Sequence, residues 1–228
     1  MTFTDRHATV NVMHSQDDRA LRRLWGLDTA PAHGPKARWS LEQLAAAAVA
    51  LADEEGIDGL SLARVAKRLG MTTTGTYRYV GSKAELIELM VDVAIGDPPP
   101  LAGDDWRARC RSWVAALADR YARHPWLPDV RPTRMPTQPR AYAWIDALVA
   151  TLTDEPQIDA MRLALLLDGL VRSYASLERS LRGSEPVPWL DDAVTMRFPR
   201  LAGVAQQEVS DARLELDFAV DAVLRGVG

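Results

Sequence analysis

Side chains suited to binding nucleic acid follow a glycine turn near residue 70. The segment after this turn offers hydroxyls, a guanidinium group, a phenol and a small glycine, at Thr72, Thr73, Thr74, Gly75, Arg78 and Tyr79. Threonine hydroxyls can hydrogen-bond to bases or phosphates, and arginine can donate two parallel hydrogen bonds to guanine. These residue types at this spacing predict a surface that enters the major groove of DNA.

Two short helices would have to position this surface. Ser61 can cap a first helix over residues 60–70, and Thr72 can cap a second that reaches about Val80. Ala66 is small enough to let the two helices cross closely, and the glycine that ends the first helix suits the turn because it readily adopts positive φ. This is the pattern of a helix-turn-helix, although a helical hairpin with no DNA partner would look alike.

Apolar residues recur at helical spacing through most of the chain, without the alternation typical of strands and without an internal repeat. The expected fold class is therefore all-α. Further helices are predicted from Ser40 to Gly56, from Ser82 to Ile95, and over about 105–123, 140–153, 157–182, 189–197 and 211–226.

Composition excludes several classes of protein. The 228 residues are 47% hydrophobic, which is enough to fill a sizeable core, yet no apolar run approaches the length of a membrane span. Cys110 is the only cysteine, so neither an intramolecular disulfide nor a cysteine-built zinc site can form. We expect a cytoplasmic protein with no membrane partner.

The net charge of −4 is unevenly distributed along the chain. Residues 1–83 carry 11 Lys/Arg against 9 Asp/Glu, and the remainder is acidic. Affinity for DNA would then come from a few well-placed groups rather than from a broad basic field.

No set of residues suggests catalysis. His124 is the only histidine after residue 96, and the chain has neither metal-ligand spacing nor a dinucleotide-binding fingerprint. We expect no enzyme activity, no cofactor and no bound metal. A purely architectural DNA binder is the stronger alternative, but such a protein would not need a second region so rich in aromatic residues.

Residues 62–71 (LARVAKRLGM) and 76–83 (TYRYVGSK) resemble the TetR (tetracycline repressor) family of regulators. Later segments, such as RYARHPW at 120–126, are similar to the tetracycline-repressor branch, so the resemblance covers about residues 40–228.

This resemblance implies that the protein is a two-fold dimer and that Tyr77 and Lys83 bind phosphate. Thr76 departs from the family pattern, because relatives usually place Leu or Ile at this hydrophobic position.

This interpretation divides the chain into three segments. Residues 1–39 form a flexible extension in which only 20–25 could make a short helix. Residues 40–96 form the helix-turn-helix domain, and 97–228 form a domain for ligand binding and dimerisation. The boundary falls at the glycine- and proline-rich stretch 96–100, which ends the preceding helix.

Basic residues near the end of the extension are further candidates for DNA contact. Lys36 and Arg38 lie closest to the first long helix and could track phosphates or enter the minor groove. A solvated tail is the alternative interpretation.

Aromatic and charged residues in the second domain suggest a small-molecule site. Flat aromatic walls with one or two cations suit a planar or acidic organic molecule. The candidate ligand-binding residues are Trp113, Trp126, Arg131, Trp144, Asp168 and Arg172. The rings could instead be ordinary core, and Asp168 could simply pair with Arg172 four residues later.

The helices expected at 157–182 and 211–226 carry more apolar surface than one subunit needs. Two such helices from each subunit would form a four-helix bundle about a two-fold axis, unless both face the intramolecular core. The sequence thus predicts a homodimeric repressor that binds a palindromic operator in double-stranded DNA and is released by a small-molecule effector. It does not specify the operator, the regulated genes or the effector.

Overall fold

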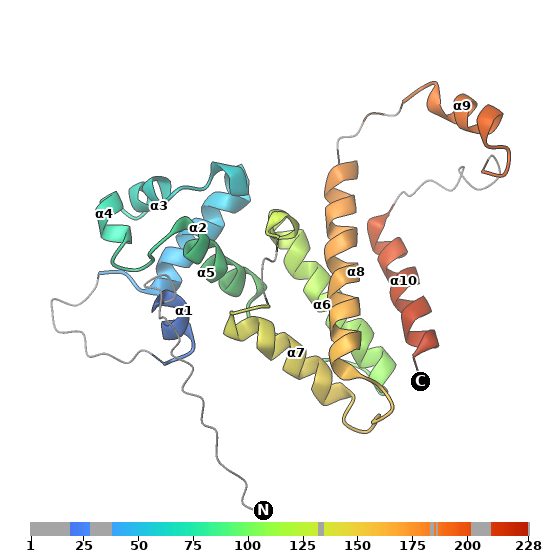
Figure 1. The fold of residues 1–228 in the computed structure, drawn as a ribbon, viewed down its shortest axis with the longest axis horizontal. Coiled ribbons are helices and arrows are strands. Elements are labelled where there is room, and N and C mark those ends of the chain that lie inside the picture. Colours follow the sequence, from blue (N-terminus) through green and yellow to red (C-terminus); the bar gives the residue numbers. More distant parts are fainter. Residues whose placement is uncertain are drawn as a thin grey trace, which may run out of the picture.

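The computed structural model describes residues 19–27, 38–131, 135–182, 185, 187–201 and 211–227. Every regular element within these residues is helical, which confirms the predicted all-α class (Figure 1). The α-helices are α1 (Arg19–Leu24), α2 (Leu41–Glu55), α3 (Leu62–Arg68), α4 (Thr73–Thr76), α5 (Lys83–Ile95), α6 (Trp106–Arg123), α7 (Pro139–Thr151), α8 (Ala160–Leu181), α9 (Leu190–Arg197) and α10 (Ala212–Gly226). Among the described residues, the 3-10 turns η2 (Ile57–Gly59) and η3 (Leu127–Asp129) follow α2 and α6.

Side-chain caps fix where the N-terminal helices begin. The hydroxyl oxygens of Ser40, Ser61, Thr72 and Ser82 each accept a hydrogen bond from the backbone N–H three residues later. Each bond satisfies a donor that the first helical turn leaves unpaired, so the polar residue sets the start of the helix.

Helix α4 is shorter than the sequence predicts, ending at Thr76 rather than near Val80. The Thr76 hydroxyl donates to the Thr73 carbonyl at 2.7 Å, and the Tyr79 N–H donates to the Thr76 carbonyl at 2.9 Å. Threonine and glycine have low helix propensity, and a threonine hydroxyl competes for helical carbonyls. The chain from Tyr77 to Tyr79 therefore continues as a turn.

Helix α5 is the centre of the molecule. It packs against α1, α2, α6 and α7, and Leu86, Leu89 and Met90 on it are almost completely buried. In Figure 1 it lies between the α2–α4 group and the C-terminal helices. A shift of α5 would therefore change contacts both with the α2–α4 group and with the C-terminal helices.

The C-terminal helices α6, α7, α8 and α10 form a bundle in which α8 packs against the other three. Trp113, Leu148, Leu167 and Leu224 contribute one fully buried side chain from each helix. Burying large apolar side chains is the main favourable contribution to the stability of such a bundle.

Part of the predicted flexible extension is a packed helix. Ala20 and Leu21 on α1 are buried, and the Ala20 N–H donates to the Glu85 carboxylate of α5 at 2.7 Å. Just after α1, the Trp25 Nε1–H donates to the Thr137 carbonyl at 2.7 Å, and its ring meets the Tyr142 ring edge-on at 5.7 Å. Helix α1 thus contacts α5 while its end reaches the start of α7.

Among the described helices, none has the length and hydropathy needed to cross a membrane.

Candidate nucleic-acid interface and cavity

The predicted DNA-facing residues form an exposed surface at one end of the molecule. Val65 and Ala66 on α3 are buried, and Gly70 makes the turn to α4 at φ 63°. Outward from this support lie the exposed side chains of Thr72, Thr73, Thr74, Tyr77, Arg78 and Lys83, with Gly75 and Tyr79 partly exposed.

Lys83 is the first residue of α5, where its side chain is exposed beside the turn that holds Tyr77. Exposed backbone N–H groups at a helix start, together with an ammonium and a phenol, can bind phosphate oxygens.

Thr76 is completely buried, although it is the residue that departs from the family pattern. Its hydroxyl is satisfied by the Thr73 carbonyl, so the position stays buried without leaving a polar group unpaired.

Arg38 is exposed, and its guanidinium carbon lies 5.6 Å from the centre of the Trp39 ring. Lys36, the other basic residue predicted to touch DNA, lies outside the described residues.

A cavity of about 530 Å³ lies among α5, α6, α7 and α8. That volume falls within the usual range for small-molecule sites. The wall is largely apolar and aromatic, and includes Val91, Ile95, Trp113, Leu117, Tyr121, Leu127, Met135, Trp144, Ile145 and Leu165. Its charged side chains are Glu88, Arg131, Asp168 and Arg172.

Five of the six predicted ligand-binding residues line this cavity: Trp113, Arg131, Trp144, Asp168 and Arg172. Trp126 does not. Its ring is buried elsewhere, and its Nε1–H donates to the Asp53 carboxylate of α2 at 2.7 Å.

Sequence reasoning missed the contribution of α5 to the wall, through Glu88, Val91 and Ile95. Leu86, Leu89 and Met90 of this helix are buried in the core, and the sequence gave no sign that a second face of the same helix lines a cavity.

Asp168 and Arg172 do not pair with each other. The Arg172 Nη1 donates to the Val130 carbonyl at 3.2 Å, and the guanidinium lies 5.6 Å from the centre of the Tyr121 ring. Burial raises the pKa of the Asp168 carboxyl, and the nearby Arg172 charge opposes that rise.

Comparisons with known proteins identify the family of this chain. Residues 44–90 match the model of the family described as "Bacterial regulatory proteins, tetR family". The HTH-type transcriptional repressor DrrR1 of Streptomyces coeruleorubidus is 34% identical over 183 residues, covering 77% of this chain and 67% of that protein. The chain belongs to the TetR family.

Solved structures of TetR-family members have the same fold. Apo ActR from Streptomyces coelicolor aligns with a TM-score of 0.72 at 21% identity, over 84% of this chain and 96% of that one. ActR in complex with actinorhodin aligns with a TM-score of 0.70 at 24% identity, over 84% of this chain and 98% of that one. TetR from Acinetobacter baumannii aligns with a TM-score of 0.60 at 16% identity, over 83% of this chain and 96% of that one. Being a TetR-family transcriptional regulator, the protein binds DNA and is not an enzyme.

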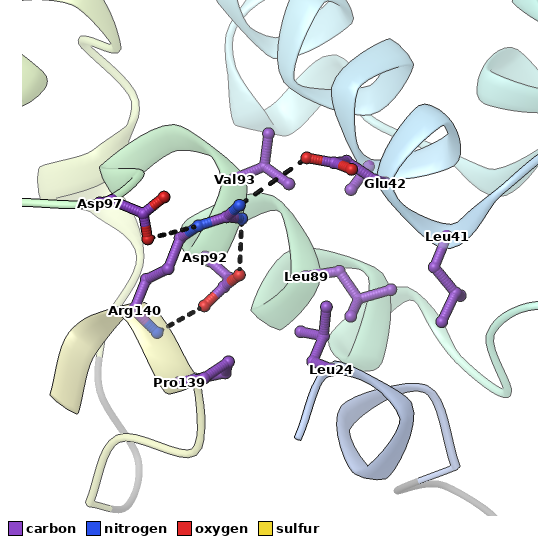
Figure 2. A pocket seen from close by; sticks show the side chains of 10 residues that line it. Leu24, Leu41, Glu42, Leu89, Asp92, Val93, Asp97, Pro139 and Arg140 are labelled. Carbon is purple, nitrogen blue, oxygen red and sulfur yellow. Dashed lines mark hydrogen bonds and ion pairs between the residues drawn. The ribbon is translucent and has the colours of Figure 1, made fainter. Parts of the chain in front are cut away.

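In this regulator a cluster of charges joins the two regions at a second, smaller hollow (Figure 2). From the start of α7, the Arg140 guanidinium donates to the buried Asp92 carboxylate at 2.9 Å and to Asp97 at 3.4 Å. It also forms an ion pair with Glu42 of α2, at 3.7 Å. Burial raises the pKa of Asp92, while hydrogen bonds and charge from Arg140 oppose the rise. Arg140 therefore ties α7 to both α5 and α2.

A further polar contact joins the regulator's two regions at the end of α6. The His124 Nδ1 lies 2.9 Å from the Asp53 carboxylate, which also accepts the Trp126 hydrogen bond. The site residues expected in the sequence included neither Arg140 nor Asp53, because nothing in their local spacing reveals a partner so distant in the chain.

Proposed function

We propose that this regulator is a repressor that binds a palindromic operator as a homodimer, acts in the cytoplasm, and leaves the DNA when a small-molecule effector occupies the cavity. The cavity carries the proposal, because it is walled by three helices of the C-terminal bundle and by α5, whose first residue is Lys83. We assign residues 40–96 to the DNA-binding domain and 97–228 to the effector and dimerisation domain, with 1–39 as an extension.

The proposed DNA contacts divide into two kinds. Tyr77, Lys83 and the basic pair Lys36 and Arg38 would bind phosphate or enter the minor groove, and Arg78 would contact bases. The remaining members of the exposed surface, which can contact either, are Thr72, Thr73, Thr74, Gly75 and Tyr79.

The dimer would form through α8 and α10. Both helices leave large apolar side chains exposed in the single chain: Met161, Leu165, Leu166, Leu177, Leu214 and Phe218. Apart from the nearby backbone of α8 itself, no atom of the described residues lies within 4 Å of a Cβ built at Gly169, in the middle of α8, so a second backbone could approach there. Exposed apolar side chains in such number are typical of a protein interface.

The effector would be a planar aromatic molecule. The relative ActR was solved with actinorhodin bound, and here Trp113 and Trp144 meet edge-on with ring centres 5.7 Å apart. Trp113, Arg131, Trp144, Asp168 and Arg172 would contact the molecule, and Trp126 would not.

Release from DNA would follow from the position of α5. A ligand against Val91 and Ile95 would displace the C-terminal part of this helix, and Arg140 would carry motion of α7 to α2 and α5. A small rotation there changes the spacing of the two DNA-binding units. If the effector binds the splayed state about 3 kcal/mol more tightly, operator affinity falls more than a hundredfold.

The experiment has two stages. DNA sequences selected for binding to the purified protein define the operator, and a panel of planar aromatic compounds including actinorhodin is then tested for release of that DNA. A compound that acts through the cavity must lose its effect on Ala141→Trp, which fills the space, while Ala102→Trp on the exposed segment before α6 retains the response. The proposal fails if no palindrome is selected, or if release is equally strong with the cavity filled.

A further inference from the structure

Asp168 is a carboxylate in the cavity wall that has no hydrogen-bond partner among the described residues. The indole N–H groups of Trp113 and Trp144 donate to backbone carbonyls, and Thr137 and Gln138 donate to Glu88. Within the part of the chain that the structure describes, Asp168 forms no hydrogen bond or ion pair. A partly buried carboxylate without a partner is costly, so it favours any ligand that brings a donor.

Among the described residues, two arginines line the cavity together with Asp168. Arg172 is turned toward the Val130 carbonyl and the Tyr121 ring, and Arg131 is exposed. Neither guanidinium is within ion-pair distance of Asp168. A planar acid would therefore meet an unpaired carboxylate in the wall, whereas a cation would be stabilised by it.

The rings beside Asp168 favour a cation of a particular kind. Burial and the nearby Asp168 charge raise the pKa of Tyr121, so its phenol ring is neutral, and Trp113 from the same helix also lines the cavity. Aromatic faces attract ammonium groups, and desolvation strengthens that attraction. A carboxylate beside such rings suits an alkylammonium group carried on an aromatic frame.

We propose that the effector carries a protonated amine, which the Asp168 carboxylate binds while the apolar walls hold the planar part of the molecule. This inference rests on the proposed function, because it concerns the ligand of the same cavity. It makes Asp168 the residue that determines specificity for charge.

A matched pair of compounds tests the amine without knowledge of the natural effector. The probes are 2-(aminomethyl)anthraquinone and its N-acetyl derivative, which share the aromatic frame and differ in charge. Calorimetry on the full chain should find the amine bound about tenfold or more tightly than the amide, as expected for a hydrogen bond to a charged group. Asp168→Asn should abolish this preference without weakening the amide.

Two control variants distinguish Asp168 from other carboxylates. Asp154→Asn removes an exposed aspartate between α7 and α8, and should keep the full preference. Glu88→Gln removes the other carboxylate of the cavity, and should keep most of it. If the preference follows Glu88, or if wild type binds amine and amide equally, the inference is overturned while the cavity proposal stands. If neither compound binds, both are contradicted.

Discussion

Arg78 and Lys83 are both exposed cations on the candidate interface, yet their surroundings predict different roles. Lys83 begins α5, where backbone N–H groups and the helix dipole already favour a phosphate. Arg78 lies in the turn after α4, beyond the threonines that would enter the groove. A phosphate contact carries no sequence information, whereas an arginine at a base edge does.

Lys83→Ala should weaken binding to all DNA sequences by a similar factor. The slope of log affinity against log salt should fall by about one, because one fewer counterion is released. Titrations of operator and unrelated DNA at several salt concentrations measure both effects. Loss confined to the operator would contradict a phosphate role.

Arg78→Ala should instead relax specificity at one operator position, at a cost of about 1–3 kcal/mol for the preferred base. Binding to a set of operators with single base changes measures it. Lys67→Ala on α3, another exposed cation, serves as the comparison, and a profile unchanged from wild type would remove Arg78 from base recognition.

At the scale of single residues, the sequence indicated which side chains belong to a site better than it indicated their hydrogen-bond partners. Trp113 and Trp144 could be named because aromatic residues are concentrated over residues 100–150, together with Arg131 in the loop before residue 139. Asp168 and Arg172 could be named because they interrupt an apolar helical run. Trp126 could not be separated from them, since its hydrogen bond to Asp53 joins residues 73 positions apart. Asp168 and Arg172 are correctly spaced for a helix pair, but the Val130 carbonyl competes for the arginine.

Helix α1 has too few residues to be stable alone, so its docking must come from tertiary contacts. The buried Glu85 carboxylate accepts hydrogen bonds from the N–H groups of Ala20 and Gly81, at 2.7 and 2.5 Å. Both donors are neutral and the acceptor is charged, which makes these bonds stronger than average.

Glu85→Gln should therefore release α1 from α5. The amide group has one acceptor oxygen in place of two, so one N–H loses its partner, at a cost of about 1–2 kcal/mol in stability. Hydrogen exchange at Ala20 and Leu21 should accelerate, and fluorescence of Trp25 should report a wetter environment. Glu54→Gln, which alters an exposed pair with Arg68, is the matched control. Unchanged exchange at α1 would show that Glu85 does not hold it.

Arg140 is the corresponding link for α7. Arg140→Met leaves the buried Asp92 carboxylate with the backbone N–H of residue 140 but without its charged partner. The loss should cost about 2–3 kcal/mol at pH 7, because the arginine itself is partly exposed. Denaturant unfolding measures the loss. Adding Asp92→Asn should recover most of it, since the buried charge is then gone.

The pH dependence of Arg140→Met has a definite sign. Burial already raises the pKa of Asp92, and losing the arginine raises it further. A raised pKa means that the folded state binds the proton more tightly, so stability grows as the pH falls through the folded pKa. The deficit relative to wild type should shrink as the pH falls from 7 toward the ordinary carboxyl range. A deficit constant over this range would contradict the buried-charge explanation.

Helix positions could be predicted where a capping residue marks them, as at Ser40, Ser61 and Ser82. The end of α4 could not, because it depends on a hydroxyl that bonds backward to Thr73. The docking of α1 was equally hidden, since the carboxylate that holds Ala20 is 65 residues away.

At the scale of the whole molecule, the sequence did not indicate which apolar side chains of α8 and α10 face the core of a single chain. On α8, Leu163 and Leu167 are buried in the bundle while Leu165 and Leu166 remain exposed. On α10, Leu216 and Val220 are buried while Phe218 is 68% exposed. Each helix thus has one face in the core and another free in the single chain, which a sequence pattern alone cannot separate.

A second copy covering these faces leads to the last prediction. Wild type should sediment as a dimer at micromolar concentration, and Phe218→Asp should give monomers, because a charge placed in an apolar interface would be desolvated without a partner. Met196→Asp on α9 is the matched control, since this methionine is still more exposed and lies on a helix with no buried residue. The monomeric variant should lose strong binding to a palindrome whose half-sites are about 34 Å apart, yet keep weak binding to one half-site. A wild-type monomer, or a dimer indifferent to Phe218→Asp, would exclude this face as the interface.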